Sequence, residues 1–147
     1  MKKVLKLLFP LVFSLLAYPA VAHHSVAAEY GNAPRVIFEG VIKELYWREP
    51  HARMRVEVTG GALPVGEVWD VNSHSPGILA RNYGFPPDMV NVGDQVLIYG
   101  RTSQWDVPRF ALYSLKINGG PEYVLSPFKT PVLDTPEREM VDFEVVP

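Results

Sequence analysis

Residues 52–72 predict a β-hairpin, and this hairpin restricts the fold more than any other segment of the sequence. Its first half, ARMRVEV, alternates strictly between apolar and charged side chains, which is the period of a half-buried strand. TGGALPVG then supplies turn residues, and EVWDVN is a second run rich in β-branched and aromatic residues. The chain is therefore expected to contain an antiparallel sheet with one apolar and one polar face.

The register of this hairpin follows from its turn. A turn centred near Ala62 and Leu63 pairs residues whose numbers sum to about 125, and a slip of one residue would set apolar side chains against polar ones. On the core face this register pairs Val56 with Trp69 and Met54 with Val71. On the outer face it pairs Arg55 with Asp70, Arg53 with Asn72 and His51 with His74. We therefore expect an Arg55–Asp70 ion pair and two histidines at one edge of a polar surface.

The remaining elements predict an all-β domain. Further strand-like runs lie at residues 35–47, 90–101, 109–117 and 121–125. Gly40 marks a bulge or bend in the first run. A short helix follows the third strand, with Ser75 as its N-cap, Pro76 in its first turn and Gly84 at its end. This order predicts an OB-fold-like five- to six-stranded barrel with one short helix between strands three and four. A β-sandwich is the alternative, although it usually has about seven strands.

The sequence divides into four segments. These are a signal peptide at residues 1–22, an N-terminal arm at 23–35, the OB-like β-barrel domain at 36–125 and a proline-rich C-terminal tail at 126–147. The first segment has three lysines, an apolar run, and small residues at Ala20 and Ala22 that suit signal cleavage. After cleavage no membrane anchor is expected, and the protein is expected in the periplasm or outside the cell. Because the chain has no cysteine, its stability must come from its core rather than from disulfides.

The charge balance excludes one class of partner. Removing the three lysines of residues 1–22 leaves 11 basic and 16 acidic residues, a net charge of −5. Nucleic-acid binding depends on neutralising phosphates, so no nucleic acid is expected as a partner. The expected partners are a metal ion, a small ligand or a protein of the cell envelope. No nucleophile motif or phosphate-binding loop is present, so a non-enzymatic binding module is favoured and no catalytic residue is named.

A metal site is the leading hypothesis. Cleavage after Ala22 would make His23 the first residue, and a free N-terminal histidine chelates metals through its amino nitrogen and Nδ1. A third imidazole, from His51 or His74, would complete an all-nitrogen site, which favours Cu(II). His24 could instead bind locally. The predicted metal ligands are therefore His23, His24, His51 and His74, with copper as the expected metal. A copper-dependent oxidative enzyme would use the same nitrogens, and a mobile terminus without a ligand is the plainest alternative.

A second hypothesis involves no metal. OB-folds bind ligands on the outer face of strands two and three and on the loops beside that face. The ligand-binding candidates are the polar residues of that face and one tryptophan of the loop after strand four: Arg53, Arg55, Asp70, Asn72 and Trp105. Arginine suits carboxylates and phosphates, so such a module would bind an anionic or sugar-like ligand or an envelope protein. An ordinary solvated face would have the same composition.

Several short motifs extend over most of the mature chain. They are AHHS at Ala22–Ser25, PH at Pro50–His51, WD at Trp69–Asp70, Ser75-Pro76 followed by Leu79 and Arg81, and Gly93-Asp94 followed by Val96 and Gly100. In these motifs the chain resembles an uncharacterised family of exported bacterial proteins known only as a domain of unknown function. That family usually has NPH where this chain has Glu49-Pro50-His51. The resemblance implies export and an OB-like barrel, and it singles out His23, His24 and His51 without implying an activity.

Overall fold

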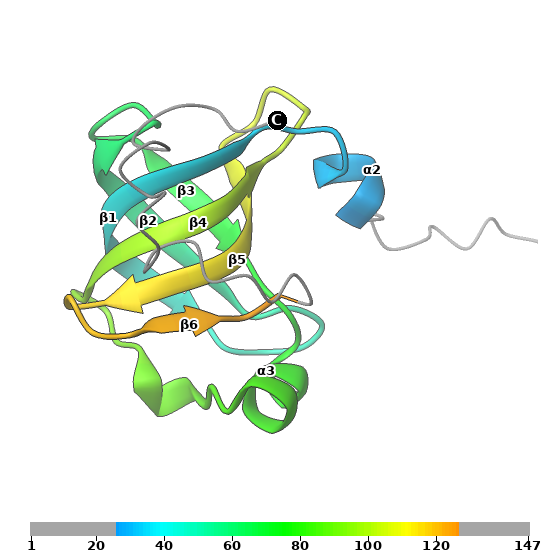
Figure 1. Cartoon of the computed structure of the whole chain (residues 1–147), viewed down its shortest axis with the longest axis vertical. Coiled ribbons are helices and arrows are strands. Elements are labelled where there is room, and N and C mark those ends of the chain that lie inside the picture. The colour runs from blue at the N-terminus through cyan, green and yellow to red at the C-terminus, as the bar shows by residue number, and fades with distance from the viewer. Residues whose placement is uncertain (1–25, 127–147) are drawn as a thin grey trace, which may run out of the picture.

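The computed structural model describes residues 26–126, which form a small barrel of strands with a helix across one end (Figure 1). The predicted signal peptide, His23, His24 and the tail from residue 127 lie outside the described residues. The strands are β1 (Arg35–Tyr46), β2 (Arg53–Gly61), β3 (Val68–Asn72), β4 (Gln95–Thr102), β5 (Arg109–Ile117) and β6 (Glu122–Val124). The helical segments are α2 (Val26–Tyr30), α3 (Pro76–Tyr83) and η1 (Pro87–Met89). Between residues 26 and 126, no helix is long and apolar enough to cross a membrane.

A parallel strand pairing closes the sheet into a barrel. The strand order is β3-β2-β1-β4-β5-β6, and β3 also pairs with β5. Five strands are thus closed into the barrel, and β6 lies outside it, paired with β5. This strand order, with α3 between β3 and β4, is that of an OB-fold, so the predicted fold class is confirmed.

The predicted register of the hairpin is confirmed for the residues of both strands. The structure pairs Arg53 with Asn72, Met54 with Val71, Arg55 with Asp70 and Val56 with Trp69. Past the strand ends, the Ala52 N–H donates to the His74 carbonyl and the Ser73 N–H donates to the Ala52 carbonyl, both at 2.9 Å. The two strands therefore stay hydrogen-bonded up to the residues that flank His51.

Helix α3 begins and ends where the sequence predicts. The Ser75 Oγ accepts a hydrogen bond from the backbone N–H of Ile78 at 3.4 Å, which satisfies one of the free donors of the first turn. Gly84 ends the helix with a left-handed φ of 61°, a conformation that glycine adopts without steric cost. Leu79, on the inner side of the helix, is buried in the core.

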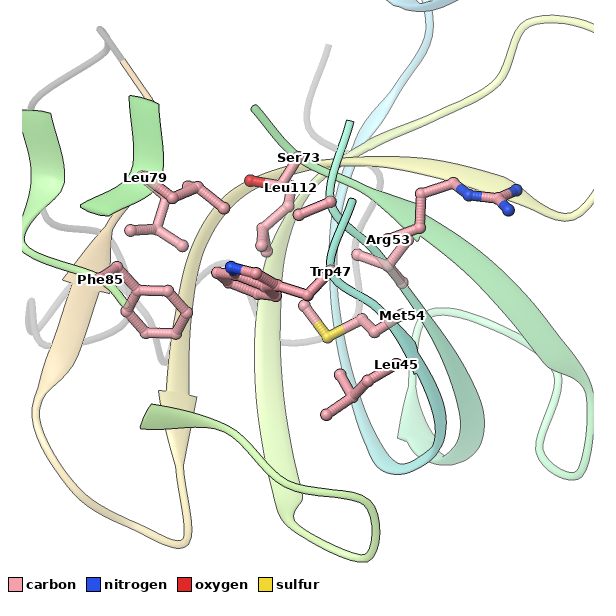
Figure 2. A pocket seen from close by; sticks show the side chains of 11 residues that line it. Leu45, Trp47, Arg53, Met54, Ser73, Leu79, Phe85 and Leu112 are labelled. Atoms are coloured by element: carbon pink, nitrogen blue, oxygen red, sulfur yellow. The ribbon is translucent and has the colours of Figure 1, made fainter. Parts of the chain in front are cut away.

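The space beneath α3 belongs to the core. Figure 2 shows Trp47, Leu79, Phe85 and Leu112 around a common centre at this end of the barrel. The cavity that remains among them is about 10 Å³, which is room for one water molecule at most. This end of the barrel is therefore packed and leaves no room for a ligand larger than water.

Within the predicted N-terminal arm, residues 26–30 form the short helix α2, which the sequence did not indicate. Its last two residues, Glu29 and Tyr30, are buried against the barrel. The Arg101 Nη1 on β4 donates to the carbonyls of Tyr30, Gly31 and Ala33, and so satisfies carbonyls that a helix end leaves without partners. Contacts with the barrel hold this segment in place, which explains why its sequence shows no helical period.

The bulge of β5 opposite Gly100 yields a first prediction. The β4–β5 register shifts between Tyr99 and Gly100, and a Cβ at Gly100 would overlap the Ala111 carbonyl and the Phe110 ring. Gly100→Ala should therefore lower the free energy of unfolding by about 2–3 kcal/mol, measured by urea denaturation. Gly60→Ala is the matched control, because its nearest neighbour is the movable Glu39 carboxylate at 3.3 Å, and it should change stability by less than about 0.5 kcal/mol. Equal losses in both variants would contradict this account.

Candidate functional site

The polar surface predicted on β2 and β3 forms, but its ion pairs differ from the prediction. We call it the polar stripe and define it as Arg53, Arg55, Asp70 and Asn72. The Arg53 Nη1 lies 3.3 Å from the Asp70 Oδ2, and the Arg55 Nη1 lies 2.9 Å from the Glu44 Oε1. The predicted Arg55–Asp70 ion pair is therefore wrong. Strand β1 runs along the other side of β2 and sets Glu44 directly opposite Arg55.

Both arginines of the polar stripe already have partners. The Arg53 guanidinium lies 5.0 Å from the centre of the Tyr46 ring, and the Arg48 guanidinium lies 5.7 Å from the same ring. The Tyr46 hydroxyl donates a hydrogen bond to Glu44, which lowers the pKa of the Glu44 carboxyl. Guanidinium groups held by carboxylates and an aromatic face have fewer donors left for an anionic ligand.

His51 lies in the loop between β1 and β2, on the surface. Its Nδ1 is 3.1 Å from the carbonyl oxygen of Ser73. A carbonyl oxygen only accepts, so this contact places the proton of the neutral ring on Nδ1 and leaves the lone pair on Nε2. Metal-binding histidines commonly make this type of bond, because it fixes both the tautomer and the direction of the free nitrogen.

His74 lies just after β3, between the polar stripe and α3. Its ring stacks on Tyr83 with 5.4 Å between ring centres and 11° between ring planes. Burial lowers the pKa of His74, and the nearby charge of His51 lowers it further. The structure therefore brings the two barrel histidines close enough to interact, and it favours the neutral form of His74.

Helix α2 docks onto the same face of the barrel. The Tyr30 hydroxyl accepts a hydrogen bond from the Asn72 Nδ2 at 3.4 Å, and the Arg109 Nη1 lies 3.3 Å from the buried Glu29 Oε1. Burial and the Glu29 carboxylate raise the pKa of Tyr30. Gln104 of the β4–β5 loop also donates its backbone N–H to the Glu29 carbonyl at 2.9 Å. Helix α2 therefore lies between Asn72 of the polar stripe and the β4–β5 loop (Figure 1).

The structure divides the predicted site residues into two groups. His51 and His74 lie at the α3 end of the β2–β3 pair, next to the polar stripe. Trp105 lies in the loop before β5; because β5 starts beside β3 and runs parallel to it, this loop is at the opposite end of the barrel from α3. Within residues 26–126, no three side chains of the metal-binding types gather into a site, so the barrel supplies two nitrogens at most.

Three residues of this region were not predicted from the sequence: Glu29, Tyr30 and Tyr83. A signal existed for Tyr83, because it closes the predicted helix that begins directly after His74. No signal existed for Glu29 and Tyr30, since each is a single residue in a segment without periodicity and only the closed barrel shows what they contact.

The surroundings of His74 yield a second prediction. A proton titration followed by NMR should give His74 a pKa below the ordinary 6.5, and His51→Ala should raise that pKa without restoring it fully, because burial remains. The unfolded chain would take up this proton at a higher pH than the folded chain. The stability that the neutral ring contributes should therefore be lost as the pH falls from about 6.5 through the lowered pKa. A pKa of 6.5 or above in the native protein would contradict the structure.

Comparison with known proteins identifies a family and gives no function. A family of unknown function, DUF6152, matches residues 12–106, whereas no curated protein matches the chain. A solved crystal structure, described as a complex of TiaS with an isoleucine tRNA and ATP, contains a chain that is 19% identical, with a TM-score of 0.41. That similarity covers 56% of this chain and 18% of the other, and nothing about function follows from it. Because the family match extends over more than half of the chain, the protein belongs to DUF6152, a family of unknown function.

Proposed function

We propose that this protein is an exported, non-enzymatic binding module that holds one Cu(II) ion through nitrogen ligands. The signal peptide is removed after Ala22, and the mature protein works in the periplasm or outside the cell. The amino nitrogen and imidazole of His23 bind the ion together with the imidazole of His51 or His74. His24 is the local alternative as the third ligand.

The docking of α2 is the observation that carries this proposal. Tyr30 is bonded to Asn72, which pairs across the hairpin with Arg53, and His51 is only two residues before Arg53. Val26 begins α2 one helical turn before Tyr30, about 6 Å away, and three extended residues before it span roughly 10 Å more. A chain attached at this point can therefore bring a free His23 to the barrel histidines.

The hydrogen bond of His51 and the lowered pKa of His74 also favour metal binding by these two imidazoles. Metals bind the neutral ring, so protons compete with them for the same nitrogens. The Ser73 carbonyl directs the free lone pair of His51 to Nε2, and burial lowers the pKa of His74. An amino nitrogen and two imidazoles form an all-nitrogen set, and such sets favour Cu(II) over the other first-row divalent ions.

A metal-free binding module is the second candidate, and a different observation favours it. A surface groove lined by Trp69 and Trp105 lies at the end of the barrel opposite α3. The polar stripe is less suited to this function, because Arg53 and Arg55 are both in ion pairs. The two candidate functions use separate parts of the surface and can be tested separately.

Calorimetry with Cu(II) tests the metal site on protein that begins at His23. One ion should bind, and His51→Ala or His74→Ala should weaken binding by at least about tenfold, whichever supplies the third nitrogen. Adding a glycine before His23 should weaken binding as strongly, because it removes the amino nitrogen from the chelate. Binding should also weaken as the pH falls through about 6.5.

His24→Ala is the matched control, because it removes an imidazole next to His23 and leaves the barrel unchanged. If the barrel completes the site, His24→Ala should bind Cu(II) as the native protein does. The opposite pattern, with a loss in His24→Ala and none in His51→Ala or His74→Ala, would overturn the shared site and leave a local chelate at the N-terminus.

The role of α2 can be tested without touching any ligand. Arg109→Ala removes the ion pair of the buried Glu29, so the attachment of α2 should loosen and Cu(II) binding should weaken roughly three- to tenfold through a lower effective concentration of His23. Lys43→Ala is the control, because it also removes one positive charge and one ion pair, with Glu57, away from α2. Equal affinities of these two variants would show that the docking of α2 does not serve metal binding.

A further inference from the structure

A groove at the end of the barrel opposite α3 has features of a second, independent binding site. It lies between the start of β3 and the β4–β5 loop and has a volume of about 450 Å³, within the range of small-ligand sites. We call it the tryptophan groove and define it by its main lining residues: Glu67, Trp69, Thr102, Trp105, Asp106 and Val107.

Two indoles supply the apolar surface of the groove. Trp69 is half-buried, and its Nε1 donates to the Glu67 Oε2 at 3.1 Å, so the polar edge of this ring is already satisfied. Trp105 remains 40% exposed, and Val107 beside it is 38% exposed. Exposed apolar side chains that lie together and are bordered by polar residues often mark an interaction site.

The β4–β5 loop that carries Trp105 is firmly attached to the barrel. The Asp70 N–H donates to the Pro108 carbonyl at 2.9 Å, which joins the loop to β3, and the Ser103 N–H donates to the Arg109 carbonyl at 2.8 Å. The Trp105 N–H also donates to the Ser103 Oγ at 3.1 Å. A loop fixed in this way loses little conformational entropy when it binds a partner.

The charge of the groove selects the type of partner. Glu67 and Asp106 line it, and none of its lining residues is a cation. The nearest arginines on β4 and β5 face α2 instead: Arg101 donates to the carbonyls at the end of α2, and Arg109 pairs with Glu29. The groove therefore joins aromatic surface to two carboxylates.

We propose that the tryptophan groove binds a basic peptide segment of a partner protein, with a lysine or arginine side chain between the indoles and the carboxylates. An ammonium or guanidinium group over a tryptophan face gains cation–π energy, and the neighbouring carboxylates add Coulomb attraction. Anionic ligands are repelled by the same carboxylates. This proposal does not depend on copper binding, because the groove and the two barrel histidines lie at opposite ends of the barrel.

NMR of the indole N–H groups tests the proposal directly, because the chain has three tryptophans and each gives its own signal. Titration with tetralysine amide should shift the signals of Trp69 and Trp105 saturably. The signal of Trp47, which lies in the core beneath α3, should not move. Binding should weaken as the salt concentration rises to roughly 0.5 M, because salt screens exposed charges.

Variants and control ligands decide the outcome. Trp105→Ala and Asp106→Asn should each bind tetralysine amide roughly three- to tenfold more weakly. Asp88→Asn, an exposed carboxylate on η1 outside the groove, should bind it as the native protein does. Equal shifts with fully acetylated tetralysine, or unchanged binding by Trp105→Ala, would overturn the proposal. Shifts with cellotetraose in place of the basic peptide would assign the groove to neutral sugars and would also overturn it.

Discussion

The parallel pairing of β3 with β5 is the contact on which the rest of the structure depends. It aligns Asp70 with Arg109, Val71 with Phe110 and Asn72 with Ala111, and so joins residues that are about forty positions apart in the sequence. On the inner side it packs Phe110 into the core, where its ring meets the Phe38 ring edge-on at a distance of 5.1 Å between centres. The same pairing places the β4–β5 loop, which carries Trp105, beside β3. On the outer face of the barrel it places Arg109 next to the polar stripe.

Helix α2 attaches where this closure brings β3 and β5 together. Asn72 of β3 holds the Tyr30 hydroxyl, and Arg109 of β5 holds the Glu29 carboxylate. A buried carboxylate is costly without a charged partner, so Glu29 ties α2 to β5, while Tyr30 ties it to β3. The position of the N-terminal segment is thus a consequence of barrel closure. This is the physical link between the fold and the proposed copper site.

The hairpin could be predicted residue by residue. Its first strand alternates strictly between apolar and charged residues, and the position of its turn determines which residues of the two strands are paired. The Arg55–Glu44 ion pair could not, since β1 has register shifts next to Gly40 and between Ile42 and Glu44, and a shifted register is not visible in the alternation. Helix α2 was missed for another reason: five residues are too short to show a period, and tertiary contacts hold them. The approach of His51 to His74 followed from the hairpin, whereas the stacking of His74 on Tyr83 required the position of α3.

The arrangement of the arginines bears on why cations are proposed as the ligands of both sites. Arg53 and Arg55 pair with carboxylates of the sheet, Arg109 pairs with Glu29, and Arg101 donates to backbone carbonyls at the end of α2. Three of these four guanidinium groups are paired with carboxylates, whereas Arg101 donates to neutral backbone carbonyls and keeps its positive charge. The two ends of the barrel carry a pair of imidazole rings and a groove with two carboxylates. Carboxylates and imidazole nitrogens are the groups that the two proposed ligands, a basic side chain and a metal ion, would contact.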